Sequence, residues 1–224
     1  AKKKMLKSVY QNGGFWIGRY EAGISSARTG KGEANEVPIV KKNSYPYNYI
    51  TRTQAKVLAE SINSGNYTSS LLFGIQWDLV MKFIETKEND SDIYLKLSSD
   101  SSTIGNYYNS KLSLYNGKFA QSILLSNWYD FNSNEKIDLV NNKQKQSQDS
   151  YMNAILLTTG ATEATKLQNI YDIAGNVWEW TLEAMTEGQA PCARRSGSCN
   201  GNGAEYMANY RNIGYISDSY GDIG

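Results

Sequence analysis

The stretch that decides the fold is residues 169–182, Asn-Ile-Tyr-Asp-Ile-Ala-Gly-Asn-Val-Trp-Glu-Trp-Thr-Leu. Its residues 177–180, Val-Trp-Glu-Trp, favour a buried strand, because two tryptophans each bury a large area and dominate a core. Glu179 alternates with the tryptophans and is expected on the opposite face of that strand. The Gly-Asn pair at 175–176 is a turn signal. Residue chemistry alone therefore predicts that this segment is structural.

Two helices are predicted upstream of this stretch. Thr51 suits an N-cap and Gln54 completes a capping box. Apolar residues follow at helical spacing, and Ser-Gly-Asn at 64–66 ends the helix. A second helix is predicted from about Gly74 to Thr86, with a broad apolar face that indicates burial rather than a cofactor site. That face consists of Ile75, Trp77, Leu79, Val80, Met81, Phe83 and Ile84.

Shorter extended segments are predicted in the N-terminal part. Residues 14–20, Gly-Phe-Trp-Ile-Gly-Arg-Tyr, have the aromatic and β-branched content of a strand. Residues 23–36 are rich in Gly, Ser and charge and are expected to form a loop. The Tyr-Pro-Tyr sequence at 45–47 is expected to be extended, because a residue before proline avoids the helical region.

The middle of the chain, residues 87–150, is polar and predicts irregular structure, which in a compact domain is usually functional or loosely ordered. Its main aromatic cluster is residues 127–131, and residues 141–150 are expected to form a loop. Residues 154–157, Ala-Ile-Leu-Leu, suit either a short strand or a helical turn. No internal repeat or clear linker divides the chain, so we expect one domain over residues 1–224.

Composition narrows the classes of partner. The chain has 224 residues, a net charge of +1 and 20% charged residues, which does not favour nucleic acid or an anionic membrane surface. No apolar run approaches the roughly 20 residues that span a bilayer, so membrane insertion is not expected. The 17 tyrosines, with many Asn and Ser, suit a contact surface like that of an antibody. The alternative is the polar-aromatic composition common in extracellular and viral β-rich proteins.

The chain contains no histidine, which removes the commonest general base and metal ligand. Ser/His and Cys/His nucleophile arrangements are therefore excluded. The two cysteines, Cys192 and Cys199, could form a local disulfide or remain free thiols, and without histidine they cannot make an ordinary Cys/His zinc site.

The segment 169–182 resembles the signature of the formylglycine-generating-enzyme-like family, a branch of the C-type lectin fold. The similarity extends to residues 14–21, 76–78 and 195–198, and so covers nearly the whole chain. It implies an α+β protein of the C-type lectin fold, with two helices packed on short twisted antiparallel sheets and much irregular structure. The positions that carry the signature are Gly175, Asn176, Trp178, Glu179, Trp180 and Arg211.

Enzymes of that family oxidise a sulfatase cysteine to formylglycine, with copper and a Cys-x4-Cys pair. Those positions fall at about Gly201 and Tyr206 here, so the resemblance does not carry the catalytic pair. We therefore predict a non-catalytic protein. A copper-dependent oxidase with a rearranged Cys192/Cys199 pair is one alternative, because paired thiolates favour Cu(I).

A calcium site is the other cofactor to consider, since the family often has one near its signature. Asp172 and Asn176 could contribute oxygens, but calcium needs six to eight of them. A capped turn without metal explains the same residues. We predict no cofactor, with a calcium-dependent carbohydrate-binding lectin as the second alternative.

The C-terminal residues 193–224 lack Lys, Gln and Trp and are dominated by Asn, Tyr, Ser, Asp, Gly and Ile. Some phage and bacterial members of the family are variable proteins of diversity-generating retroelements. In those, Asn codons are randomised and become Tyr, Ser, Asp, Gly, Ile, Arg, Ala or Cys, but not Lys, Gln, Glu, Met or Trp. The segment resembles that repertoire; the alternative is a polar lectin-like tail that lacks lysine by chance.

Residue chemistry also favours binding by this segment, because tyrosines give rigid contact area and small polar residues give adaptable hydrogen bonds. Ile213 and Ile216 suit either apolar anchors of the face or core residues of a strand. The predicted ligand-binding residues are Arg194, Ser196, Asn200, Asn202, Tyr206, Asn209, Tyr210, Asn212, Tyr215, Ser217, Asp218, Ser219, Tyr220 and Asp222.

The resemblance implies a protein or glycan ligand on a host or target surface. It implies display on a phage tail tip or a bacterial cell surface. It also allows a homo-oligomer, because display proteins are often symmetric and multivalent.

Overall fold

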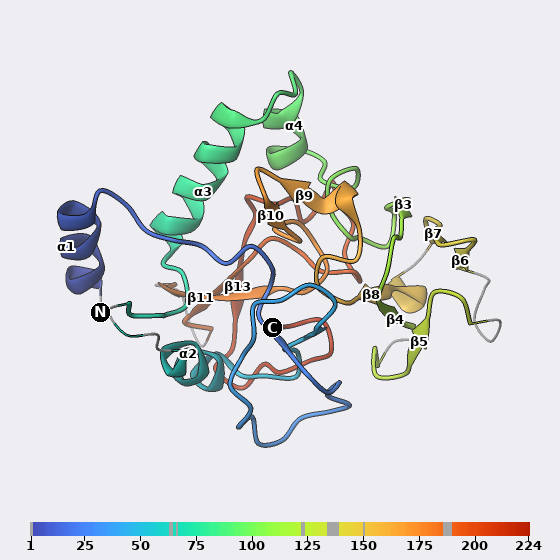
Figure 1. Cartoon of the computed structure of the whole chain (residues 1–224), viewed down its shortest axis with the longest axis horizontal. Coiled ribbons are helices and arrows are strands. Elements are labelled where there is room, and N and C mark those ends of the chain that lie inside the picture. Colours follow the sequence, from blue (N-terminus) through green and yellow to red (C-terminus); the bar gives the residue numbers. More distant parts are fainter. Residues whose placement is uncertain are drawn as a thin grey trace.

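The computed structural model describes residues 2–62, 65, 67–121, 124–133, 139–149, 151–185 and 190–224. Within them the protein is a mixed α+β structure of helices and small antiparallel sheets, which confirms the predicted α+β class (Figure 1). The helices are α1 (Lys2–Asn12), α2 (Arg52–Ser61), α3 (Gly74–Lys87) and α4 (Ile93–Ser98), with 3-10 turns η1 (Tyr151–Asn153) and η2 (Glu163–Thr165).

The strands form five small sheets in the described part of the chain, and the paired strands in each of these sheets are antiparallel. Two are pairs, β1 (Gly23–Ile24) with β2 (Tyr45–Pro46), and β9 (Lys166–Leu167) with β10 (Ile170–Tyr171). Three have the orders β3-β7-β6, β5-β4-β8 and β11-β12-β13. Their bounds are β3 (Leu112–Ser113), β4 (Lys118–Gln121), β5 (Trp128–Asp130), β6 (Val140–Asn141), β7 (Gln144–Lys145), β8 (Ile155–Leu157), β11 (Glu179–Ala184), β12 (Cys192–Arg195) and β13 (Arg211–Gly214).

Helix α2 begins as predicted. The Gln54 N–H donates to Thr51 Oγ1 (3.3 Å), and the Thr51 N–H donates to Gln54 Oε1 (2.9 Å), which is the capping box. The helix ends at Ser61. Of the predicted terminating residues, 64 and 66 lie outside the described residues.

Helix α3 has the predicted bounds to within one residue, but the prediction that its whole apolar face is buried is wrong. Trp77, Val80, Met81 and Ile84 are buried in one core cluster. Three further apolar residues of the helix, Ile75, Leu79 and Phe83, are exposed. Its apolar residues thus spread over a wider arc than the core side of the helix can cover.

The predicted strand at residues 14–20 is also wrong, because that segment lies outside any strand. Phe15 and Ile17 pack against the core cluster built on α3. One backbone bond, from the Tyr171 N–H to the Arg19 carbonyl (2.8 Å), ties the segment to β10. The segment is therefore held mainly by the packing of its apolar side chains and not by a ladder of backbone hydrogen bonds.

The polar middle region holds more regular structure than predicted. Residues 141–150 are not simply a loop, because β6 and β7 form a hairpin whose turn residues Asn142 and Lys143 have φ of 47° and 62°. Lys145 of β7 is fully buried, where its ammonium donates to the carbonyls of Tyr107 and Ser110. Burial lowers the pKa of Lys145 to about 7. Residues 155–157 form a strand, which resolves the alternative left open for that segment.

The tryptophan segment confirms the predicted burial but shifts the strand. Trp178 and Trp180 are both buried, and the regular strand β11 starts at Glu179. Trp178 instead forms a parallel bridge with Ile223 near the C-terminal end of the chain. The signature segment, residues 169–182, therefore contacts the predicted ligand-binding segment directly.

Candidate ligand-binding face

The tight turn before the tryptophans depends on residues in the left-handed region. Gly175 has φ of +71° and Asn176 has φ of +63°, as the turn signal predicts. A Cβ added to Gly175 would lie 2.3 Å from the carbonyl oxygen of Asn106. Only glycine fits this position, so the turn is held against the segment that contains Asn106.

The Asn176 side chain is the buried centre of that turn. Its Oδ1 accepts from Asn106 Nδ2 (2.8 Å) and from the Leu157 N–H (3.1 Å). Its Nδ2 donates to Glu21 Oε2 (2.7 Å) and to the Leu157 carbonyl (3.2 Å). The Asn176 amide thus joins the turn at residues 175–176 to β8 and to the N-terminal part of the chain.

Three carboxyl groups near this turn have raised pKa values. Burial raises the pKa of Glu179 to about 8, and the charge of Asp172 adds to the effect. Burial raises the pKa of Asp172 to about 6. Burial also raises the pKa of Glu21, and the charges of Asp172 and Glu179 raise it further. Burial therefore makes ionisation of each of these groups less favourable than it is in water.

Asp172 and Asn176, the two residues considered above for calcium, use their side-chain oxygens in hydrogen bonds within the protein. Asp172 Oδ1 accepts from Thr165 Oγ1 (2.7 Å) and its Oδ2 accepts from the Gly160 N–H (2.6 Å). The Asn176 oxygen is likewise engaged by two protein donors. Among the described residues, no group of three or more acidic or cysteine side chains is arranged to hold a metal ion.

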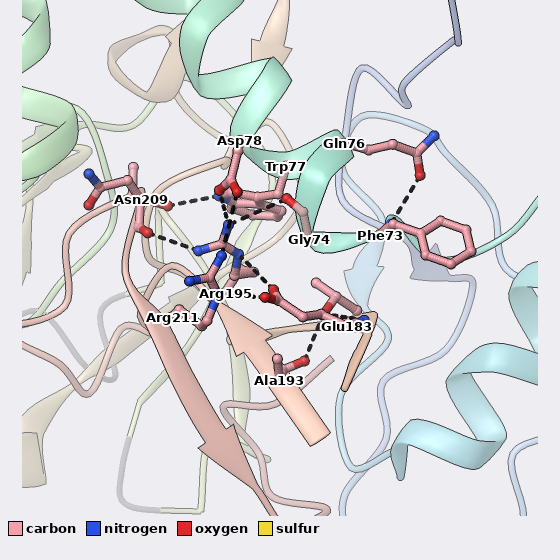
Figure 2. Close-up of polar contacts among 12 residues, drawn as sticks. Phe73, Gly74, Gln76, Trp77, Asp78, Glu183, Ala193, Arg195, Asn209 and Arg211 are labelled. Atoms are coloured by element: carbon pink, nitrogen blue, oxygen red, sulfur yellow. Dashed lines mark hydrogen bonds and ion pairs between the residues drawn. The ribbon is translucent and has the colours of Figure 1, made fainter. Parts of the chain in front are cut away.

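Beneath the C-terminal segment lies a network of charges centred on Arg195 (Figure 2). The Arg195 guanidinium, 1% exposed, donates to Asp78 of α3 and lies 3.7 Å from Glu183 Oε2. Glu183 Oε1 also pairs with Arg211 Nε at 2.7 Å, and Arg211 Nη2 lies 3.4 Å from Asp78 Oδ2. Burial lowers the pKa of Arg195, and the two carboxylates counter that effect. The network fastens α3 to the sheet β11-β12-β13.

The same buried groups hold the chain between Tyr206 and Tyr210 by its main-chain atoms. Trp77 Nε1 donates to the Ala208 carbonyl (3.0 Å), and Arg195 Nη1 donates to the Asn209 carbonyl (3.0 Å). Both contacts come from side chains outside this short segment, as Figure 2 shows for Arg195 and Asn209. The backbone position is therefore independent of the side chain that residue 209 carries.

The end of the chain is held in the same way. Carbonyl groups of residues 220–224 accept hydrogen bonds from donors of the signature segment and of residues 48–49. The bonds are Tyr49 N–H to Tyr220 (3.0 Å), Asn48 Nδ2 to Gly221 (2.8 Å), Trp178 N–H to Asp222 (2.8 Å) and Trp180 N–H to Gly224 (3.0 Å).

An aromatic cluster of Trp178, Tyr206 and Tyr210 lies at the inner side of this segment. The Trp178 and Tyr206 ring centroids are 5.3 Å apart, and those of Tyr206 and Tyr210 are 5.4 Å apart, both edge to face. The Arg194 guanidinium lies over the Trp178 ring, 4.9 Å from its centroid. Arg194 Nη1 lies 3.9 Å from Asp218 Oδ2. Such edge-to-face and cation–π contacts fix the rings that the face presents.

The outer part of the face is more open. Tyr215 and Tyr220 are each 52% exposed, and Lys31 Nζ lies 4.6 Å from the Tyr220 ring centroid. Ile213 and Ile216 are exposed as well, which resolves their alternative in favour of the surface. Large side chains thus gather in solvent along β13 and the residues that follow it.

The fourteen predicted binding residues divide into three groups by burial. Asn209, Tyr215, Ser217 and Tyr220 are exposed, whereas Ser196 and Ser219 are buried. Ser196 Oγ accepts from the Gly175 N–H (2.9 Å), which places it within the scaffold. The half-buried residues are Arg194, Asn200, Asn202, Tyr206, Tyr210, Asn212, Asp218 and Asp222.

Some half-buried members also serve the scaffold. Asn202 Oδ1 accepts from Asn109 Nδ2 (3.2 Å), and its Nδ2 donates to the Tyr108 hydroxyl (3.1 Å). Asp222 Oδ2 accepts from Ser198 Oγ (2.9 Å). The exposed face is therefore narrower than the sequence alone indicates.

Two polar side chains protect the edge strand β13 and its continuation. Asn212 Oδ1 accepts from the Ile213 N–H (2.9 Å), and Asp218 Oδ2 accepts from the Tyr215 N–H (2.9 Å). A free strand edge with unpaired donors invites pairing with another chain. Occupying these donors favours recognition through side chains over strand addition.

Asp78, Glu183 and Lys31 contribute to the face or its support, and sequence reasoning did not predict those roles. The sequence marks Asp78 only as part of the similarity at residues 76–78. Ion pairs between residues far apart in the chain cannot be read from the sequence. Cys192 and Cys199 are free and buried, in different core clusters.

The sequence matches no protein-family model and no curated protein. None of the helices in the described ranges is long and apolar enough to span a membrane.

Proposed function

We propose that this chain is a non-catalytic ligand-binding protein of the C-type lectin fold, whose recognition surface lies on residues 206–220. In this proposal it is the variable protein of a diversity-generating retroelement of a phage or bacterium. It is displayed on a tail tip or cell surface to bind a protein or glycan.

The observation that carries the proposal is how the C-terminal segment is held. Its carbonyl groups at residues 208, 209, 220 and 222 accept hydrogen bonds from the scaffold. The side chains of Asn209, Tyr215, Ser217 and Tyr220 meanwhile lie in solvent. Main-chain anchoring supports a surface whose side chains can change without loss of the backbone, which a diversified site requires.

The chemistry of the exposed residues supports binding through aromatic anchors. Tyr215 and Tyr220 offer rigid contact area, with Ser217 and Asn209 as adaptable polar contacts. The thiols give little support to the copper-oxidase alternative. Burial raises the pKa of Cys199 well above its usual value, which disfavours the thiolate that copper would need.

Two experiments test the proposal. The gene should carry Asn-type codons at the exposed positions, a near-identical template repeat and a neighbouring reverse transcriptase; absence of all three would reject the retroelement origin. A display library randomised at Asn209, Tyr215, Ser217 and Tyr220 should keep most members folded and yield binders to new targets. A matched library at Asn176, Trp180 and Arg195 should be largely unfolded, and equal folding of the two would contradict main-chain anchoring.

A further inference from the structure

The exposed apolar side of α3 forms one straight ridge. Ile75, Leu79 and Phe83 lie four residues apart, so their side chains follow a single row along the helix. Their exposed fractions are 47%, 51% and 46%. Three large apolar side chains in a row are more than the scattered exposure normal for a protein surface.

Helix α1 carries a second set of exposed apolar side chains, next to the half-buried Met5 and Val9. None of its residues is buried, and it lies at the left edge of Figure 1, apart from the rest of the fold. Leu6 and Tyr10 are 47% and 90% exposed. Because most helical stability in proteins comes from packing of an apolar face, the exposed Leu6 and Tyr10 side of α1 is suited to covering by a partner.

The two helices are complementary in shape. On α1, Met5 with Val9 and Leu6 with Tyr10 form two parallel rows of residues four apart. The groove between two such rows receives a single row of the same spacing on a facing helix. The ridge on α3 is a row of that kind.

Their charges are complementary as well. Helix α1 carries four lysines and no acidic residue. Residues 85–92, at the end of α3, hold four carboxylates and the single basic residue Lys87. Two of these carboxylates are already paired, Glu85 with Lys82 and Asp90 with Lys96 (both 2.6 Å). Glu88 Oε2 also accepts hydrogen bonds from the Gln168 N–H and Nε2 (both 3.1 Å). The negative charges of Glu88 and Asp92 favour an antiparallel contact, with the lysines of α1 at the C-terminal end of α3.

We propose that α1 of one copy docks on the Ile75–Leu79–Phe83 ridge of a second copy, and reciprocally, so that the chain forms a two-fold dimer. A single copy leaves both surfaces exposed, and the exchange covers both at once. Gly13 and Gly14, with open space around them, link α1 to Phe15, which packs on the core. This inference does not depend on the proposed ligand-binding function.

Sedimentation velocity of the whole chain over a wide concentration range tests the dimer. The wild type should dimerise reversibly, and Leu79→Lys and Tyr10→Lys should each weaken the dimer by at least roughly tenfold. Tyr10 is almost fully exposed, so its substitution leaves the fold intact. The control Val57→Lys, at an exposed apolar position on α2, should dimerise as the wild type does. A mixture of Leu79→Lys and Tyr10→Lys should recover part of the affinity, because one of the two contacts remains intact.

Three outcomes would overturn the proposal. The first is a monomeric wild type at every concentration. The second is an intramolecular disulfide in a monomeric Leu6→Cys/Leu79→Cys chain, which would mean that α1 docks on its own ridge. The third is a monomer that binds phosphatidylserine vesicles and loses that binding on Tyr10→Lys but not on Leu79→Lys. That result would assign α1 to a membrane surface.

Discussion

The Arg195 guanidinium is almost completely buried, whereas its ion-pair partner Asp78 is 53% exposed. Figure 2 shows how the two side chains meet. The two residues lie 117 positions apart and join β12 to α3. Because Arg195 also donates to the Asn209 carbonyl, the pair positions the backbone of the candidate face. An exposed carboxylate thus positions a buried charge and, through it, the backbone of the candidate face.

Asp78→Ala should lower the free energy of unfolding by about 2–4 kcal/mol, because Glu183, 3.7 Å away, is then the remaining carboxylate beside the buried guanidinium. Urea denaturation measures the change. The control Glu85→Ala removes an exposed pair with Lys82 and should change stability by about 1 kcal/mol or less. Equal effects of the two substitutions would mean that Arg195 is not held by Asp78.

The parts of the fold that sequence could predict are those fixed by local rules. The capping box of α2 needs only Thr51 and Gln54, and the period of α3 needs only its own residues. Strands such as β1 and β2, with two residues each, carry no period that a sequence pattern could reveal. The segment wrongly predicted as a strand at 14–20 has the composition of a strand, but its contact with β10 is a single backbone hydrogen bond and not a ladder.

The candidate site follows the same division. The tyrosines of the face could be identified by residue type, and Tyr215 and Tyr220 are indeed exposed. Ser196 is of a suitable type too, but its burial depends on a contact with Gly175, 21 residues away. The support from Asp78 needed the three-dimensional arrangement, since Asp78 and Arg195 lie 117 positions apart in the chain.

Gly175→Ala should destabilise the protein by roughly 2–6 kcal/mol, because it adds left-handed strain to a clash with the Asn106 carbonyl. Gly65 is the matched control, since its φ is +61° and a Cβ there meets nothing within 4 Å. Gly65→Ala should show the strain alone, about 1 kcal/mol. Thermal and urea unfolding report both values. Equal destabilisation at the two sites would show that close packing of the turn is unimportant.

Stability should fall as pH rises from about 4.3, the ordinary pKa of a glutamic acid, to about 8, the raised pKa of Glu179. In that window native Glu179 holds a proton that the unfolded chain has released, so the slope is negative. Its size is at most about 1.4 kcal/mol per pH unit for one proton. Glu179→Gln should flatten the curve and stabilise the protein at pH 8 relative to the wild type.

Glu163 provides the opposite case for the same urea titration. Lys166 and then Tyr171 lower its pKa to about 2, so its contribution is present above about pH 4.3 and disappears as pH falls toward 2. Glu163→Gln should therefore weaken the protein at neutral pH and have no effect near pH 2. A Glu179→Gln curve with the wild-type slope would rule out Glu179 as the titrating group.

Tyr215→Ala and Tyr220→Ala should leave the free energy of unfolding within about 0.5 kcal/mol of the wild type, because both rings are half-exposed. Trp180→Ala should lower it by about 3–5 kcal/mol, since the indole is buried and its Nε1 donates to the Ile50 carbonyl (3.0 Å). For any target selected on the wild-type face, binding affinity should depend more on Tyr215 and Tyr220 than on Trp180. There the tyrosine variants should each lose about 2 kcal/mol of binding free energy or more, measured by calorimetry. If the tyrosine variants instead unfolded as readily as Trp180→Ala, those rings would belong to the core and the recognition surface would have to lie elsewhere.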